Sequence, residues 1–177
     1  MRSASWPTSI TWFVTERCNL SCRHCFVHNS RHKPRPELDW EAVAKFLASC
    51  NGRIRELVLT GGEPLLWRHV EPFRLQMAQL EPMSVKICTN GMEWTRLEQL
   101  YSSLKERHQV SIQVSLDGPK DIHNQIRGNP KAFDAAIKVV ETYRATCVTV
   151  LTRANLKRLS EVRALVEQYA VPWALIY

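Results

Sequence analysis

Two kinds of hydrophobic pattern alternate along this chain. Short apolar runs rich in β-branched and aromatic residues predict strands, and segments with apolar residues three or four positions apart predict helices. The strand-like runs cover residues 10–15, 55–60, 85–89, 110–116, 147–152 and 173–177. Helical spacing follows the first five of these runs, over residues 40–50, 70–80, 94–104, 133–140 and 159–169.

Strands that alternate regularly with helices predict an α/β fold whose parallel strands are joined by right-handed crossovers. Six β/α units are fewer than the eight of a closed barrel. We therefore expect a parallel (β/α)6 partial TIM-like barrel that is open on one side. Residues 1–177 are long enough to bury one hydrophobic core, so a single domain is expected.

The strand predicted at residues 110–116 has one apolar face and one polar face. Its residues alternate strictly, in the order Val110, Ser111, Ile112, Gln113, Val114, Ser115, Leu116, Asp117. A parallel strand covered on both sides would be apolar nearly throughout. The polar face is therefore expected to look onto a cavity or a bound ligand, with Thr149 and the inward-facing thiols of Cys88 and Cys147 as further candidates for its wall.

The unusual short motifs all follow predicted strands. They are residues 18–25, 61–64, 90–91, 117–119 and 153–155. The carboxyl ends of parallel strands meet at one edge of a sheet, and ligands of such folds bind at that edge. The motifs therefore predict one binding site.

Composition and charge narrow the function classes. The net charge of +7 suits an acidic partner or ligand, but Lys and Arg are spread along the chain, so nucleic-acid binding is not expected. No apolar run is long enough for a transmembrane helix, and the N-terminus lacks the apolar core of a signal peptide. A cytoplasmic protein with reduced thiols is the expectation.

Cys18, Cys22 and Cys25 lie within eight residues and leave a four-ligand metal site one ligand short. Zinc and an iron–sulfur cluster both use such cysteines, and His28 would complete a structural Cys3His zinc site. The other cysteines are far apart, and Cys50 lies on the apolar side of a predicted helix. We expect them to be buried thiols.

The remaining motif residues carry groups that suit one kind of ligand. Gly61-Gly62 is either a tight turn or a place where backbone groups approach a ligand closely, and Glu63 beside it suits an ammonium group. Ser115 and Asp117 can hold the hydroxyls of a ribose, although Asp117 is also a common turn residue. Arg127 can pair with a carboxylate. An amine, a ribose and a carboxylate together describe S-adenosylmethionine.

With CxxxCxxC at residues 18–25 and Gly-Gly-Glu-Pro at 61–64, the chain resembles the radical SAM superfamily. Residues 115–119 and 123–128 make it most similar to the core domain of the peptide-modifying branch that carries a SPASM or twitch extension. The resemblance implies that Cys18, Cys22 and Cys25 ligate a [4Fe-4S] cluster whose fourth iron binds S-adenosylmethionine. The residues it implies for binding that cofactor are Gly61, Gly62, Glu63, Pro64, Asn90, Ser115, Asp117 and Arg127, together with His24, which either stacks near the adenine or fills space.

The resemblance also implies an activity and partners. Reductive cleavage of S-adenosylmethionine would yield a 5'-deoxyadenosyl radical that abstracts a substrate hydrogen, with electrons from a flavodoxin- or ferredoxin-type donor. A peptide or protein substrate is expected, and no residue is assigned to its chemistry. The alternatives are a glycyl-radical-enzyme activase, disfavoured because its usual Asp-x-Lys is absent at residues 115–118, and the zinc module. No cysteine follows Cys147, so no auxiliary-cluster domain is expected in this chain, which would be a truncated core or a minimal enzyme.

Overall fold

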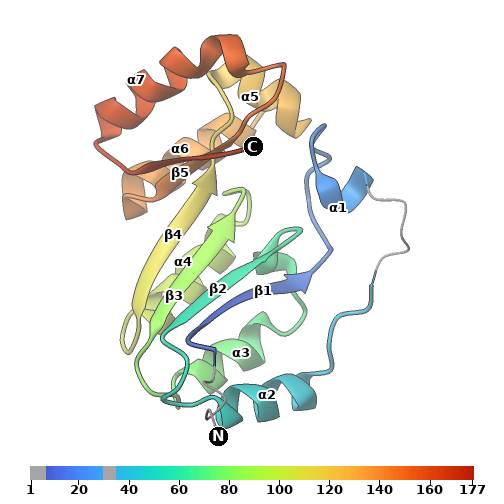
Figure 1. Cartoon of the computed structure of the whole chain (residues 1–177), viewed down its shortest axis with the longest axis vertical. Coiled ribbons are helices and arrows are strands. Elements are labelled where there is room, and N and C mark those ends of the chain that lie inside the picture. The colour runs from blue at the N-terminus through green and yellow to red at the C-terminus, as the bar shows by residue number, and fades with distance from the viewer. Residues whose placement is uncertain (1–6, 30–34) are drawn as a thin grey trace, which may run out of the picture.

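The computed structural model describes residues 7–29 and 35–177, and its centre is one parallel sheet of six strands. The strands pair in sequence order, so each is joined to the next by a crossover (Figure 1). Their bounds are β1 Ser9–Thr15, β2 Glu56–Gly61, β3 Ser84–Thr89, β4 Gln109–Ser115, β5 Thr146–Val150 and β6 Trp173–Ile176. The strands β1 and β6 are the two edges and do not pair with each other, which confirms a partial barrel open on one side.

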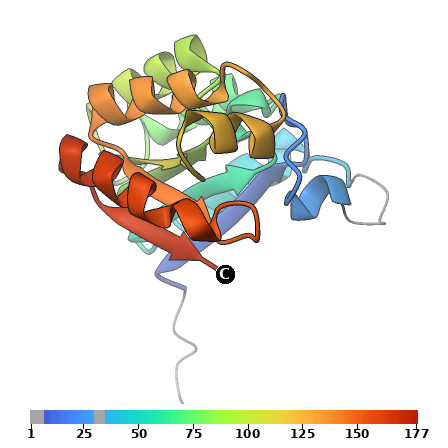
Figure 2. The same cartoon turned by 90° about the horizontal axis from the view of Figure 1, so that it is seen from above.

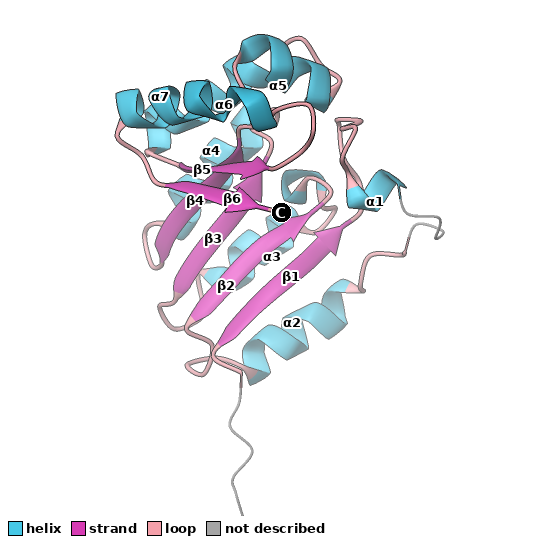
Figure 3. Cartoon of the chain, turned by 45° about the horizontal axis from the view of Figure 1, so that its top comes forward, coloured by secondary structure: helices cyan, strands magenta, loops and turns pink. Residues whose placement is uncertain are grey.

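Helices pack on the outer side of the curved sheet (Figures 2 and 3). The long ones are α2 Trp40–Ser49, α3 Val70–Met77, α4 Trp94–Leu104, α6 Ala132–Tyr143 and α7 Leu159–Tyr169. Shorter ones lie near the carboxyl ends of the strands: α1 Phe26–Asn29, α5 Lys120–Arg127 and the 3-10 turns η1 Pro64–Leu66 and η2 Leu156–Arg158. No helix of the described residues is long and apolar enough to cross a bilayer.

The core lies between the sheet and these outer helices. Alternate residues of the inner strands are buried there, including Leu57 and Leu59 of β2 and Val85 and Ile87 of β3. Apolar side chains of the helices pack against them, and Phe73 of α3 is fully buried. Burying one face of each strand leaves the opposite face free to line a cavity, as the alternating pattern of β4 predicts.

Several local predictions differ from the structure. The helix α5 was not expected, because the polar residues His123 and Arg127 fill buried positions that are usually apolar. Phe46 lies one turn before Cys50, on the side of α2 that its apolar spacing predicts to be buried, yet it is 44% exposed. The strand β5 ends at Val150, two residues before its predicted end.

Candidate functional site

A cavity of about 450 Å³ opens at the carboxyl ends of the strands. This volume lies in the usual range for small-molecule sites. Its wall combines the cysteine loop with residues from β2 to β6: Cys18, Cys22, His24, Cys25, Phe26, Val27, Thr60, Gly61, Gly62, Cys88, Thr89, Asn90, Gln113, Val114, Ser115, Arg127, Val148, Val150 and Ile176. The structure thus brings residues of the first three predicted motifs together at one site, whereas no residue of 117–119 or 153–155 lines the cavity.

The cysteine loop is held between two parts of the fold. On one side, the Glu63 amide donates to the Arg17 carbonyl at 2.7 Å, and a Cβ on Gly62 would lie 2.3 Å from that same oxygen. On the other side, the Arg23 amide donates to the Ile126 carbonyl of α5 at 2.9 Å. Glycine at position 62 therefore lets the loop sit directly on the end of β2.

The three loop cysteines are half-buried and face one cavity. Burial raises the pKa of Cys18 and of Cys22, and the nearby Arg127 partly offsets this at Cys22. Each of these two sulfurs also lies 3.7 Å from a side-chain N–H donor, which is Asn90 Nδ2 for Cys18 and Arg127 Nη1 for Cys22. Metal binding requires such thiols to lose their protons.

Glu63 lies behind the cavity wall and is fully buried. Its carboxylate accepts hydrogen bonds from Thr89 Oγ1 at 2.9 Å, the Asn90 amide at 2.8 Å and the Leu65 amide at 3.3 Å. Burial raises its pKa to about 7, and these hydrogen bonds only partly offset the rise. No ion pair with Glu63 is present among the described residues to lower the pKa further. A direct contact with a ligand amine would require the carboxylate to exchange these partners. Pro64 is also buried, at the start of η1, and does not line the cavity.

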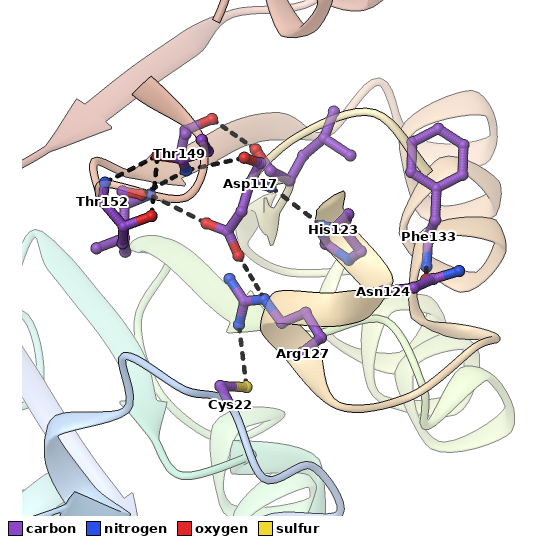
Figure 4. A network of polar contacts seen from close by, with 11 residues as sticks. Cys22, Asp117, His123, Asn124, Arg127, Phe133, Thr149 and Thr152 are labelled. Carbon is purple, nitrogen blue, oxygen red and sulfur yellow. Dashed lines mark hydrogen bonds and ion pairs between the residues drawn. The ribbon is translucent and has the colours of Figure 1, made fainter. Parts of the chain in front are cut away.

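Asp117 is fully buried at the opposite part of the rim and is held by a cation (Figure 4). Its Oδ2 accepts from Arg127 Nε at 2.6 Å, and its Oδ1 accepts from the Val150 amide at 3.1 Å. The expected ribose role would therefore need this carboxylate to turn out of its ion pair. Arg127, by contrast, reaches the cavity wall.

Two residues of this network had no expected role. His123 of α5 accepts the Asp117 amide through Nδ1 at 3.0 Å, and burial lowers its pKa to about 4. Asn155 is fully buried, and its amide group donates to the Asp117 and Val150 carbonyls, each at 2.8 Å. A signal was present for His123, since it lies four positions before Arg127 and so shares its helix face.

The polar face of β4 does look onto the cavity, as predicted. Gln113 and Ser115 line it, and the Cys88 thiol donates to Gln113 Oε1 at 3.2 Å. Burial raises the pKa of Cys88 to about 11, so this thiol is protonated at neutral pH. Cys147 and Cys50 instead lie in the core, each 1% exposed, and Thr149 is buried away from the cavity.

His24 also lines the cavity, and its Nδ1 is buried without a hydrogen-bond partner among the described residues. Burial lowers its pKa, so the ring is neutral at neutral pH. A buried polar atom without a partner is costly. The ring nitrogen is thus available to a bound molecule.

The model of one protein family, the radical SAM superfamily, matches residues 12–157. The chain belongs to the radical SAM superfamily. Its members bind a [4Fe-4S] cluster and S-adenosylmethionine, and solved structures with this fold contain bound S-adenosylmethionine.

Two curated relatives show the range of names among similar proteins. The sporulation killing factor maturation protein SkfB of Bacillus subtilis is 31% identical over 97% of this chain and 42% of its own length. The Fe-coproporphyrin III synthase of Methanosarcina barkeri is 28% identical over 95% of this chain and 43% of its own length. The chain therefore spans about two-fifths of the length of these relatives.

Among solved structures, SuiB of Streptococcus suis bound to its precursor peptide SuiA has the same fold, with a TM-score of 0.76. The identity is 16%, and the match covers 97% of this chain and 39% of that one. At this identity the likeness shows the fold alone.

The residues present fit both groups that the superfamily binds. The thiols of Cys18, Cys22 and Cys25 face one cavity, whose wall also holds a ring nitrogen without a hydrogen-bond partner among the described residues. Within the described ranges, no three His, Cys, Asp or Glu side chains converge on a point where one metal ion would bind. A four-iron cluster needs no such convergence, because each cysteine binds a different iron. His28, the fourth residue of the zinc alternative, has a side chain outside the described set.

Proposed function

We propose that residues 1–177 form one radical SAM core domain in which Cys18, Cys22 and Cys25 ligate the cluster. The single observation that supports this most strongly is that the three thiols line one 450 Å³ cavity at the carboxyl edge of a partial barrel. When bound there, the cluster and S-adenosylmethionine supply a one-electron reduction that yields a 5'-deoxyadenosyl radical, which abstracts a hydrogen from the substrate.

The protein's own part is to bind and orient S-adenosylmethionine and to exclude water. Gly61 and Gly62 present backbone groups at the cavity wall, and Ser115 presents a hydroxyl suited to the ribose. Arg127 offers N–H donors to the carboxylate, and His24 offers a neutral ring to the adenine. For Glu63 and Asp117 the proposed contacts with the amine and the ribose require the exchange of partners described above. The other members of the proposed cofactor-binding set are Asn90, which lines the cavity, and Pro64, which is buried outside it.

The proposed substrate is a peptide or protein. The name of SkfB and the peptide bound to SuiB support this class, while the Fe-coproporphyrin III synthase marks a tetrapyrrole as the second candidate. The strands β1 and β6 do not pair, so the barrel is open between them, and we propose that a substrate larger than the cavity enters from this side. We further propose a cytoplasmic enzyme that receives electrons from a flavodoxin- or ferredoxin-type donor.

Anaerobic reconstitution tests the cluster and the cleavage together. Iron and sulfide should give a brown protein whose broad visible absorbance is bleached by dithionite, and added S-adenosylmethionine should give 5'-deoxyadenosine. Cys22→Ala should lose this product, whereas Cys50→Ala, which changes a buried core thiol, should retain it. A colourless protein with one tightly bound zinc, or full cleavage by Cys22→Ala, would refute the proposal.

A further inference from the structure

The sulfurs of Cys18 and Cys22 each accept a hydrogen bond from a side chain outside the cysteine loop. The Cys18 sulfur lies 3.7 Å from Asn90 Nδ2, and the Cys22 sulfur lies 3.7 Å from Arg127 Nη1. Asn90 follows β3, and Arg127 ends α5, so the donors come from opposite sides of the cavity. One donor is neutral and the other is a cation.

The position of Arg127 is set by a buried ion pair (Figure 4). Its Nε donates to Asp117 Oδ2 at 2.6 Å, and the two side chains are 9% and 0% exposed. Asp117 is held in turn by the Val150 amide. A guanidinium is planar, so fixing Nε on one side directs Nη1 toward Cys22 on the other.

We propose that Arg127 sets the reduction potential of the cluster through its hydrogen bond to Cys22, that Asp117 is its positioning residue, and that Asn90 acts in the same way, more weakly, at Cys18. This inference rests on the proposed cluster. It adds a role to Arg127 that is separate from binding the carboxylate of S-adenosylmethionine.

The direction of the effect follows from charge. One electron from a reductant such as dithionite converts the [4Fe-4S]2+ cluster to [4Fe-4S]+, so the reduced state carries one more negative charge. Hydrogen bonds to cluster sulfurs and nearby positive charge stabilise the reduced state and raise the potential. A charged donor in a buried setting acts more strongly than a neutral one.

The two roles of Arg127 are distinguished by leaving S-adenosylmethionine out. Arg127 has five N–H donors, and the contacts with Asp117 and Cys22 use two of them. Donors therefore remain for a carboxylate. An effect on the cluster in the absence of S-adenosylmethionine cannot arise from binding that carboxylate.

The experiment is an anaerobic redox titration of the reconstituted protein without S-adenosylmethionine, followed by the electron paramagnetic resonance signal of the reduced cluster. At a fixed solution potential, Arg127→Gln should lower the ratio of reduced to oxidised cluster about tenfold, which corresponds to a shift of about 59 mV for one electron. Arg127→Lys, which keeps the charge on a shorter side chain, should give an intermediate shift. Asn90→Ala should give a smaller shift, because the donor that it removes is neutral. The backbone N–H of Asn90, which donates to Glu63, is retained in this variant.

Lys120→Ala is the matched control. Lys120 begins the same helix and pairs with Asp134 at 2.8 Å, but both side chains are 59% exposed and neither lines the cavity. The cluster of the Lys120→Ala protein should have the wild-type reduction potential. Equal potentials in wild type, Arg127→Gln and Arg127→Lys would overturn the inference and leave Arg127 only a carboxylate ligand.

Loss of the cluster from both Arg127 variants would also overturn it, because the residue would then hold the cysteine loop together without tuning the cluster. Absence of any cluster from the wild-type protein would instead refute the proposed function. The two failures are therefore distinguishable.

Discussion

The rim of the cavity buries one carboxylate on each side, and the two are stabilised differently. On the β2–β3 side, Glu63 is held by two amides and one hydroxyl, all neutral. On the β4–α5 side, Asp117 is held by the guanidinium of Arg127 as well as by an amide. Both side chains are fully buried.

This difference shows how the same type of group serves two purposes. Without a cation, burial raises the pKa of Glu63 to about 7, so its charge depends on pH near neutrality. With a cation, the carboxylate of Asp117 fixes the direction of an arginine beside a cysteine sulfur. Near neutral pH, the Glu63 side of the rim can gain or lose a proton, whereas the Asp117 side positions a charge.

The largest effect on stability is expected from Asp117→Asn. Removing one member of a buried ion pair leaves the other charge without compensation, which costs about 3–5 kcal/mol. Urea unfolding of the cluster-free protein measures this loss. Lys120→Ala, which breaks an exposed pair, should cost about 0–1 kcal/mol. Equal costs for the two variants would contradict the distinction between buried and exposed pairs.

Glu63→Gln should change the pH dependence of stability. The folded protein holds the Glu63 proton up to about pH 7, whereas the unfolded chain loses it near 4.5. Stability from this group therefore decreases as pH rises from about 4.5 to about 7 and is level above that, by a total of about 3 kcal/mol. Unfolding free energies measured at pH 5 and pH 8 should show this decrease in the wild type and not in the variant. An identical pH profile in both proteins would contradict the expectation.

His123→Asn should show the opposite slope on the other side of the rim. The pKa of His123 is lowered from 6.5 to about 4, so the unfolded chain binds this proton first as pH falls. The free energy of unfolding of the wild type should therefore fall by about 3 kcal/mol between pH 6.5 and pH 4. The variant should not show this fall, because Asn carries an acceptor for the Asp117 backbone amide but does not titrate. Unfolding at pH 7 and pH 4.5 tests this, and a steeper loss in the variant would refute it.

Two glycine variants test how closely each side of the rim packs against the cysteine loop. Both should destabilise the protein less than the variants above. Gly62→Ala should cost about 1–3 kcal/mol, because the new Cβ would lie 2.3 Å from the Arg17 carbonyl oxygen. Gly128→Ala should cost about 1 kcal/mol, because its φ of 69° is unfavourable for alanine while its Cβ would lie 3.2 Å from the Ser21 carbonyl oxygen. Melting temperatures of both variants measure these costs. A larger loss of stability for Gly128→Ala than for Gly62→Ala would contradict the expected order.

The periodicity of apolar residues in the sequence was sufficient to predict the architecture. The number of β/α units, the open barrel and the polar face of β4 follow from spacing, because burial repeats every two residues in a strand and every three to four in a helix. The position of the motifs after the strands was sufficient to place them at one edge. The cysteine motif together with Gly-Gly-Glu-Pro was sufficient for the superfamily.

Only the tertiary structure decided which way the polar side chains of that edge point. Glu63 and Asp117 both follow strands and look alike in sequence, yet both turn into the protein and bind different partners. Arg127 contacts Cys22 across 105 residues of chain. No local pattern encodes such a contact, because a polar side chain bonds to whichever donors and acceptors the packed elements bring within hydrogen-bond distance. The sequence by itself thus determined the fold and the cofactor chemistry, and packing decided how the charges around the cysteines are arranged.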